Sequence, residues 1–150
     1  MAEFKLPPGI APLPYASLLQ IEIVEASKDG IRGKMKVRPD ICTGGHILHG
    51  GAIMSFADTL GAFGAMHVLP EGGQGTTTLD SKTNFLGSAK EGETVLAHCT
   101  PVHVGRRTSV WQTSITTDWT GLVPRAAMTP GWESRPRSVN VPSSDAVATA

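Results

Sequence analysis

One stretch of this sequence, from Gly50 to Leu69, is the only long segment with the apolar spacing of an α-helix. Its apolar residues recur at helical intervals, at Ile53, Phe56, Ala57, Leu60 and Ala65. Pro70 and the glycine-rich run that follows it predict the end of this helix. Because the rest of the chain has mainly strand patterns, this one helix must pack across a sheet, which restricts the fold more than any other feature.

Five segments around this helix carry the patterns of β-strands. They are residues 19–26, 31–38, 76–86, 94–104 and 107–117. The connections between successive strands are short, which predicts antiparallel neighbours, because a parallel crossover needs about a dozen residues or more. The sequence therefore predicts an α+β domain, with a curved antiparallel sheet of five to six strands around one long central helix.

The two ends of the chain differ in composition from its middle. Residues 1–14 contain four prolines, which favours an extended or turn-rich arm. A sixth strand would be expected after the last predicted one, and residues 121–128 are its candidate, although Pro124 suits only an edge strand. From 129 to 150 the chain is rich in Pro, Arg and Ser and is expected to be a disordered tail. The domain is thus placed at residues 15–128.

Length and charge restrict the classes of function. The chain has 150 residues, enough for one domain, with 13 basic and 13 acidic side chains. This balance argues against a nucleic-acid-binding or membrane-surface protein, and no apolar run approaches the roughly 20 residues of a membrane span. No secretory signal is recognised, so a cytoplasmic location is expected. Cys42 and Cys99 are expected to be buried, reduced thiols.

Gly50 and Asp58 are the residues of this helix that suggest chemistry. Glycines at a helix N-terminus leave free N–H groups that can hold a developing negative charge. Aspartate is a poor helix-interior residue, so Asp58 is either a solvated surface group or a catalytic carboxylate. Eight residues of helix separate the two by about 12 Å, too far to act on one carbonyl. If both act, Gly50 of one subunit must meet Asp58 of another, which requires at least a dimer.

Four motifs give the chain a resemblance to a known family. They are Leu48-His49-Gly50-Gly51, Ala57-Asp58-Thr59, Asn84-Phe85-Leu86 with Ala89-Lys90, and Val102 to Arg107. Residues 15–118 resemble the hotdog-fold acyl-CoA thioesterases, in the branch of the phenylacetate-pathway and 4-hydroxybenzoyl-CoA thioesterases. An acid nine residues after the histidine, on a helix followed by a strand ending in Asn-Phe-Leu, makes the combination specific. The resemblance implies a single hotdog domain that hydrolyses a thioester of coenzyme A.

The resemblance also implies a role for each matching residue of the reaction centre. Gly50 corresponds to the residue whose backbone N–H polarises the thioester carbonyl. Asp58 corresponds to the catalytic acid, acting as nucleophile or as general base on water. His49 is implied to orient the loop or the thioester, and Thr78 to position the water.

Six further positions are implied to bind the substrate. They are Thr43, His46, Asn84, Lys90, Arg106 and Arg107. The family often has Gln or Asn where this chain has the shorter Thr43, and His46 is a nearby substitute. Arg106 and Arg107 match the turn that touches the nucleotide end of coenzyme A in relatives, although a basic turn can also be merely solvated. Coenzyme A is part of the substrate, so no cofactor is expected, and relatives usually pair such dimers into homotetramers.

Other functions are less well supported by the sequence. Cys42, His46 and His49 are too few for a zinc site without a second pair of ligands, so no metal is expected. An enoyl-thioester hydratase is a weaker alternative, because no histidine lies within five residues after Asp58. A non-catalytic acyl-CoA-binding protein of the same fold is the other alternative, and the intact Gly50 and Asp58 favour hydrolysis over it. The sequence leaves the acyl group open, either aryl or short to medium chain.

Overall fold

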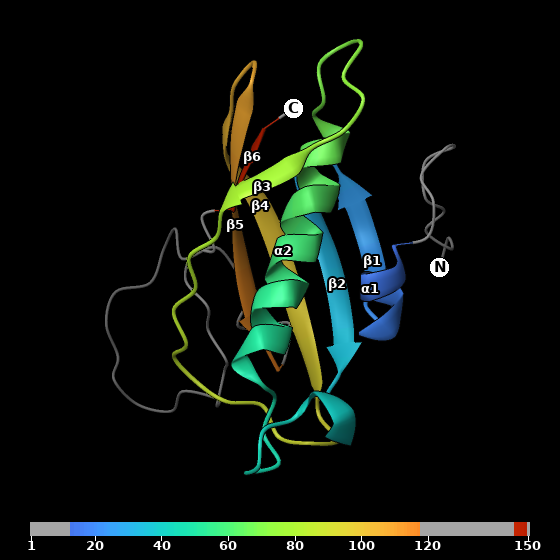
Figure 1. Ribbon diagram of the computed structural model, residues 1–150, viewed down its shortest axis with the longest axis vertical. Coiled ribbons are helices and arrows are strands. Elements are labelled where there is room, and N and C mark those ends of the chain that lie inside the picture. The colour runs from blue at the N-terminus through green and yellow to red at the C-terminus, as the bar shows by residue number, and fades with distance from the viewer. Residues whose placement is uncertain (1–12, 118–145, 150) are drawn as a thin grey trace.

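A computed structural model of the protein describes residues 13–117 and 146–149. Within them, six strands form one sheet in the order β1-β2-β4-β5-β6-β3 (Figure 1). The strands are β1 (Glu22–Ser27), β2 (Gly30–Lys36), β3 (Thr77–Asp80), β4 (Thr94–Val104), β5 (Thr108–Thr116) and β6 (Ala146–Thr149). Each pair of neighbouring strands is antiparallel, and the short connections predicted this for β1 with β2 and for β4 with β5.

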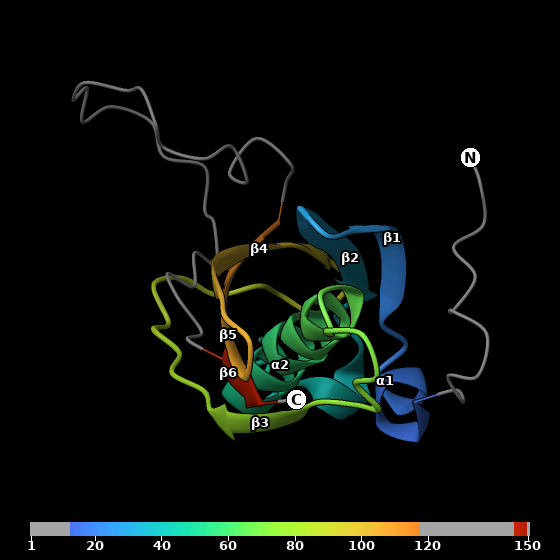
Figure 2. The same cartoon turned by 90° about the horizontal axis from the view of Figure 1, so that it is seen from above.

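The long helix α2, Gly50–His67, lies in the hollow of this sheet. Figure 2, seen from above, shows the strands curving around α2 from β1 on one side to β3 on the other. The buried face of the helix is apolar and includes Ile53, Phe56, Leu60 and Phe63. The predicted helix and the predicted α+β architecture are therefore confirmed.

Two glycines let α2 approach the sheet closely. A Cβ added to Gly33 of β2 would lie 3.2 Å from Cε2 of Phe56. A Cβ added to Gly64 of α2 would lie only 2.6 Å from Cε3 of Trp111, a fully buried side chain of β5. Because protein interiors are close-packed, a larger residue at Gly64 would force the helix or the indole to move.

A short helix, α1 (Pro14–Leu18), precedes the first strand. Proline fits its first position, because the N–H that proline lacks would have no helical partner there. Arg38 follows β2 and donates from Nη1 to the Leu19 carbonyl at 2.9 Å and from Nη2 to the Leu18 carbonyl at 3.1 Å. The same guanidinium binds Asp40 and lowers the pKa of that carboxyl. Arg38 therefore ties the end of α1 to η1 (Pro39–Ile41), the 3-10 turn that precedes α2.

β3 is shorter than the strand predicted at residues 76–86. It ends at Asp80, and residues 81–89 continue without a strand partner in the described chain. Its described neighbour β6 has only four residues, and the register between the two strands shifts between Thr78 and Asp80, where their pairing in the described residues ends. The predicted end of this strand is therefore wrong. β3 is also an edge of the sheet, where one side of its backbone faces away from the other strands.

β6 lies within the stretch that the sequence predicts to be a disordered tail. It pairs with β5 on one side and with β3 on the other, so the expectation is wrong for these four residues. The hydrogen bonds of this ladder join backbone N–H and C=O groups, which every non-proline residue has. The side-chain pattern of the tail therefore gave no sign that β6 would pair with β5 and β3. The candidate strand at 121–128, the remainder of the tail and residues 1–12 of the arm lie outside the described residues.

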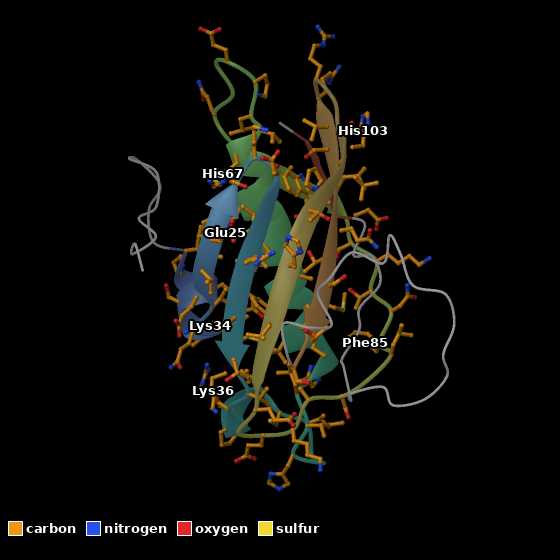
Figure 3. The ribbon with its side chains drawn as sticks, turned by 180° about the vertical axis from the view of Figure 1, so that it is seen from behind. Glu25, Lys34, Lys36, His67, Phe85 and His103 are labelled. Atoms are coloured by element: carbon orange, nitrogen blue, oxygen red, sulfur yellow. The ribbon has the colours of Figure 1, made fainter. Side chains whose placement is uncertain are left out.

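The outer face of the sheet is polar and carries Lys34 and Lys36 of β2 and Glu25 of β1 (Figure 3). Lys34 Nζ pairs with a carboxylate oxygen of Glu22 at 2.9 Å across the two strands. Exposed ion pairs of this kind contribute little stability each. Because the outer face of the sheet is polar, its opposite, apolar face is the one that covers α2. No helix in the described ranges combines the length and apolar character needed to cross a bilayer.

The two cysteines are free thiols, as expected, but they differ in exposure. Cys99 of β4 is fully buried, and this burial raises the pKa of its thiol to about 12. Cys42 is only half-buried, because it lies on the surface segment before α2, where its Sγ donates to the Arg38 carbonyl at 3.2 Å. The expectation of a buried thiol is therefore confirmed for Cys99 and wrong for Cys42.

Candidate functional site

The N-terminal turn of α2 is held by backbone and side-chain hydrogen bonds. The carbonyl of the N-cap residue His49 accepts from the Ala52 N–H at 2.9 Å and the Ile53 N–H at 3.2 Å. The ring Nδ1 of His49 accepts from the Gly51 N–H at 2.9 Å. Because the His49 carbonyl and the Gly50 N–H share one planar peptide unit, these bonds also fix the direction of the Gly50 N–H. That N–H has no acceptor in the described part of the chain, so it is available to a ligand.

Both glycines of this turn leave room for a neighbouring ring. A Cβ on Gly50 would lie 3.3 Å from Cζ of Phe85, and a Cβ on Gly51 would lie 3.0 Å from Nδ1 of His49. The Phe85 ring is 50% exposed, so it borders the Gly50 amide at the surface. Glycine at position 51 therefore leaves room for the His49 ring that caps the helix, and glycine at position 50 leaves room for the Phe85 ring beside the free Gly50 N–H.

Asp58 lies half-buried on α2, between residues of the buried face and the solvent. Its Oδ1 accepts a hydrogen bond from Oγ1 of Thr78, on β3, at 2.9 Å. Its second oxygen, Oδ2, has no donor among the described residues. The packing of β3 across α2 (Figure 1) thus brings together two of the residues implied by the resemblance. The carboxylate is oriented by one bond and keeps one oxygen open for a water or a substrate.

Gly50 and Asp58 do not meet within one chain. Both belong to the continuous helix α2, so eight residues separate them by about 12 Å along its axis. A reacting carbonyl needs its oxyanion donor and its base or nucleophile each within about 3 Å. If both residues act, one chain therefore carries two half-sites, one at the N-terminal turn of α2 and one at the Asp58–Thr78 pair.

Thr43 and His46 lie on a small hairpin that leads into α2. The Thr43 N–H donates to the Ile47 carbonyl at 2.8 Å, and His46 takes a φ of 54°. His46 Nδ1 lies 2.7 Å from Oε2 of Glu91, which belongs to the turn before β4. The structure therefore gives the His46 ring a protein partner, whereas the resemblance implies a contact with substrate.

Asn84 and Lys90 belong to the connection between β3 and β4. In this connection residues 81–89 run from β3 back toward the N-terminal end of α2 (Figure 1). Figure 3 shows Phe85 on this segment, on the side of the molecule away from β1. Asn84 is half-buried, and the Lys90 side chain is exposed. The connection thus carries the two substrate-binding candidates on the stretch that also supplies the ring beside Gly50.

Arg106 and Arg107 lie near the opposite end of α2. They form the turn between β4 and β5 and are exposed. They line a small surface pocket together with Val68, which caps the C-terminus of α2, and Thr76, which precedes β3. Arginine offers a planar fork of donors that matches phosphate oxygens. Within one chain, this basic pocket is therefore at the far end of the helix from Gly50.

Tyr15 and Ser55 are neighbours of the site that the sequence analysis did not single out. Tyr15 Oη lies 2.9 Å from Ser55 Oγ, and Ser55 is one turn of α2 before Asp58. The two residues are 40 positions apart, and no local pattern connects them. Within residues 13–117 and 146–149, no three His, Cys, Asp or Glu side chains gather where they could hold a metal ion.

The sequence matches a known family over more than half of its length. Residues 45–123 match the family described as the thioesterase superfamily. A candidate esterase of Mycobacterium tuberculosis is 30% identical over 125 residues, which cover 79% of this chain and 89% of that protein. The 1,4-dihydroxy-2-naphthoyl-CoA hydrolase of Escherichia coli is 39% identical over 69 residues, covering 46% of this chain and 49% of the hydrolase.

Solved structures share the fold. A thioesterase of Haemophilus influenzae superposes with a TM-score of 0.67 and 27% identity, covering 90% of this chain and 80% of that one. A protein of the phenylacetic acid degradation operon of Escherichia coli superposes with a TM-score of 0.69 and 20% identity, covering 91% and 83%. The predicted hotdog fold is thus confirmed.

Proposed function

This chain belongs to the thioesterase superfamily and is a thioester hydrolase, and we propose that it hydrolyses acyl-CoA thioesters at a site shared by two copies of the chain. In this site, Asp58 of one copy acts on the carbonyl that the Gly50 N–H of the other copy polarises. The proposal is carried by the 2.9 Å hydrogen bond from Thr78 to Asp58, which orients the carboxylate and leaves Oδ2 open.

Asp58 suits either of two roles in breaking the thioester. As a nucleophile, its Oδ2 attacks the carbonyl carbon and expels the CoA thiolate, leaving an anhydride that water then hydrolyses. As a general base, it takes a proton from a water that attacks the same carbon. In both roles negative charge develops on the carbonyl oxygen, where the Gly50 N–H and the positive end of α2 would stabilise it.

The open edge of the sheet supports a site between two copies. β3 is an edge strand, and all four of its residues are exposed. Large apolar side chains lie on or just after it, since Leu79, Phe85 and Leu86 are 60%, 50% and 63% exposed. Soluble proteins usually cover an apolar strand edge. A second copy along β3 would cover it and could bring its own Gly50 to Asp58, and two such dimers would form the tetramer that the resemblance implies.

The remaining candidates would hold the coenzyme A part of the substrate. Arg106 and Arg107 would bind its phosphates, because each guanidinium can donate two hydrogen bonds to one phosphate. Asn84, Lys90 and the hairpin of Thr43 and His46 would line the path of the thioester near Gly50. The reaction needs no cofactor of the protein's own, because coenzyme A arrives as the leaving group of the substrate.

Turnover by an Asp58→Asn variant tests this proposal. Asparagine keeps an oxygen that can accept from Thr78, so the fold and the binding of a non-hydrolysable CoA thioether should be unchanged. We expect kcat to fall by about 10²- to 10⁴-fold on aryl- and alkyl-CoA substrates, measured by release of free thiol. A variant with near wild-type kcat would remove Asp58 from the mechanism.

Asp29→Asn is the matched control for this loss of charge. That carboxylate is 77% exposed on the turn between β1 and β2 and pairs with Lys28. Its replacement should leave kcat unchanged, so an equal loss in both variants would indicate a general charge effect. A wild-type protein that hydrolyses simple thioesters and none of the CoA thioesters would contradict the proposed substrate class.

A further inference from the structure

We propose that Tyr15 is a positioning residue for the oxyanion donor Gly50, acting through Ser55 and Gly51. The inference rests on the proposed function and adds Tyr15 and Ser55 to its site. Tyr15 Oη lies 2.9 Å from Ser55 Oγ, and Ser55 Oγ donates to the Gly51 carbonyl at 2.8 Å. The Gly51 N–H donates to Nδ1 of His49 at 2.9 Å. Side chains therefore hold both polar groups of the residue that follows Gly50.

This series of hydrogen bonds has one direction. A serine hydroxyl has a single proton, and that of Ser55 goes to the Gly51 carbonyl. The bond between Tyr15 and Ser55 must therefore be donated by the tyrosine hydroxyl. Hydrogen bonds in series polarise one another, so loss of the Tyr15 hydroxyl should also weaken the bond from Ser55 to Gly51.

Tyr15 is also fixed from the side away from α2. It belongs to α1, and Arg38 donates to the carbonyl of Leu18, the last residue of α1, at 3.1 Å and to that of Leu19 at 2.9 Å. The Arg38 side chain is only 17% exposed, and its bond to the Leu19 carbonyl is partly buried. Leu13 and Leu19, which flank α1, pack against the core, whereas no residue of α1 itself is buried, so the Tyr15 side chain is held by its polar contact. The bond between Tyr15 and Ser55 and the bonds from Arg38 make α1 a brace that connects α2 to the segment after β2.

The N-terminal turn of α2 needs such a brace because it begins with two glycines. Glycine has more backbone freedom than any other residue, and a Cβ at either position would press on Phe85 or His49. An oxyanion donor must lie about 3 Å from the oxygen that it stabilises, so a small rotation of the peptide weakens it. Anchoring Gly51 through Ser55 limits the rotation that its neighbour Gly50 can make.

A double-mutant cycle tests the inference by kinetics. Tyr15→Phe should lower kcat by about three- to tenfold with little change in KM, because the lost alignment matters in the transition state. Ser55→Ala should lower kcat at least as much, because it removes both hydrogen bonds. In the Ser55→Ala background, Tyr15→Phe should have no further effect, since its partner is gone. Equal losses from Tyr15→Phe in both backgrounds, or a change in KM alone, would overturn the inference.

Thr59→Val is the matched control within the same helix. Thr59 Oγ1 donates to the Ser55 carbonyl at 2.7 Å, which is the same type of bond as that from Ser55 to Gly51, one turn further along. This bond does not reach Gly51, so its loss should change kcat by less than about twofold. A loss as large as that of Ser55→Ala would show that any side-chain bond to the α2 backbone matters, and the inference would fail.

A second readout reports the contact without any activity. The chain contains one tyrosine, so incorporated 3-fluorotyrosine gives a single ¹⁹F resonance from position 15. This resonance should shift with Ser55→Ala and stay in place with Thr59→Val, and an unmoved resonance in Ser55→Ala would overturn the inference. A wild-type protein without thioesterase activity would overturn the proposed function and this inference with it. An active wild type with a fully active Tyr15→Phe variant would overturn this inference alone.

Discussion

Thr78 Oγ1 donates a hydrogen bond to Asp58 Oδ1 at 2.9 Å, joining β3 to the middle of α2. The two residues are 20 positions apart in the sequence. The bond holds the carboxylate in one orientation, which in the proposed site would lower the reorganisation needed for it to act on a thioester. The Thr78 oxygen can still accept a hydrogen bond from a water that approaches Oδ2.

Removing this hydroxyl should therefore slow turnover without unfolding the protein. Thr78→Val keeps the branched shape, and we expect kcat to fall by about tenfold, the loss typical of one hydrogen bond to a charged group. Thr78→Ser keeps the hydroxyl and should retain most of the activity. Steady-state kinetics of the two variants on one CoA thioester make the comparison. Equal kcat values for the valine and serine variants would mean that the bond has no role in turnover.

A site built from two copies predicts complementation between inactive variants. Gly50→Pro removes the N–H at the first helical position, where proline is tolerated, and Asp58→Asn removes the carboxylate. In a mixed dimer, one of the two sites has both wild-type groups. Random 1:1 mixing makes about half of the dimers mixed, so about one quarter of wild-type activity should return. Activity of the refolded mixture is measured against each variant refolded alone. An active monomer in sedimentation experiments would contradict the shared site.

The basic turn should matter for coenzyme A rather than for the acyl group. Arg106→Ala combined with Arg107→Ala should raise KM for a CoA thioester far more than it lowers kcat, because the phosphates are remote from the reacting carbonyl. The effect should shrink for a pantetheine thioester and at high salt. Lys28→Ala is the control for charge, since Lys28 is 76% exposed on another turn. If the double variant kept the wild-type preference for CoA over pantetheine thioesters, the turn would be only a solvated loop and would not bind coenzyme A.

Gly64 should be intolerant of any side chain. Gly64→Ala places a Cβ 2.6 Å from the buried ring of Trp111, and we expect the free energy of unfolding to fall by about 1–3 kcal/mol. Thermal and urea unfolding measure this loss. Gly44→Ala is the control, because a Cβ there has no atom within 4 Å. A Gly64→Ala variant as stable as the Gly44→Ala variant would mean that α2 can move away from β5 at no cost.

The parts of the fold and site that depend on local spacing could be predicted. α2 and β4 begin where the sequence places them, because glycines mark their ends and their apolar periods are long. The open N–H of Gly50 follows from its position at a helix start, whereas the cap by the His49 ring was seen only in the structure. The distance between Gly50 and Asp58 could also be predicted from the sequence, because the rise per residue of an α-helix is constant.

Contacts between distant segments could not be predicted in the same way. The resemblance implied that Thr78 positions a water, but its bond to Asp58 could not be predicted, because a residue of a four-residue edge strand gives no local signal of what it contacts. The bond between Tyr15 and Ser55 joins a five-residue helix to α2 across 40 positions of sequence. The pairing of β6 uses backbone groups that all sequences share, so composition wrongly indicated disorder there.

The sequence by itself determined one helix wrapped by an antiparallel sheet, and it determined that Gly50 and Asp58 of one chain cannot act on the same carbonyl. Both conclusions rest on residue periodicity and helix rise, which are local properties. Only the tertiary structure decided what lies against the exposed parts of α2, namely Thr78 at Asp58, Tyr15 at Ser55 and Phe85 beside Gly50. Those contacts depend on how β3, α1 and the β3–β4 connection pack, and a hydrogen bond between remote segments forms only when packing brings its donor and acceptor to about 2.9 Å.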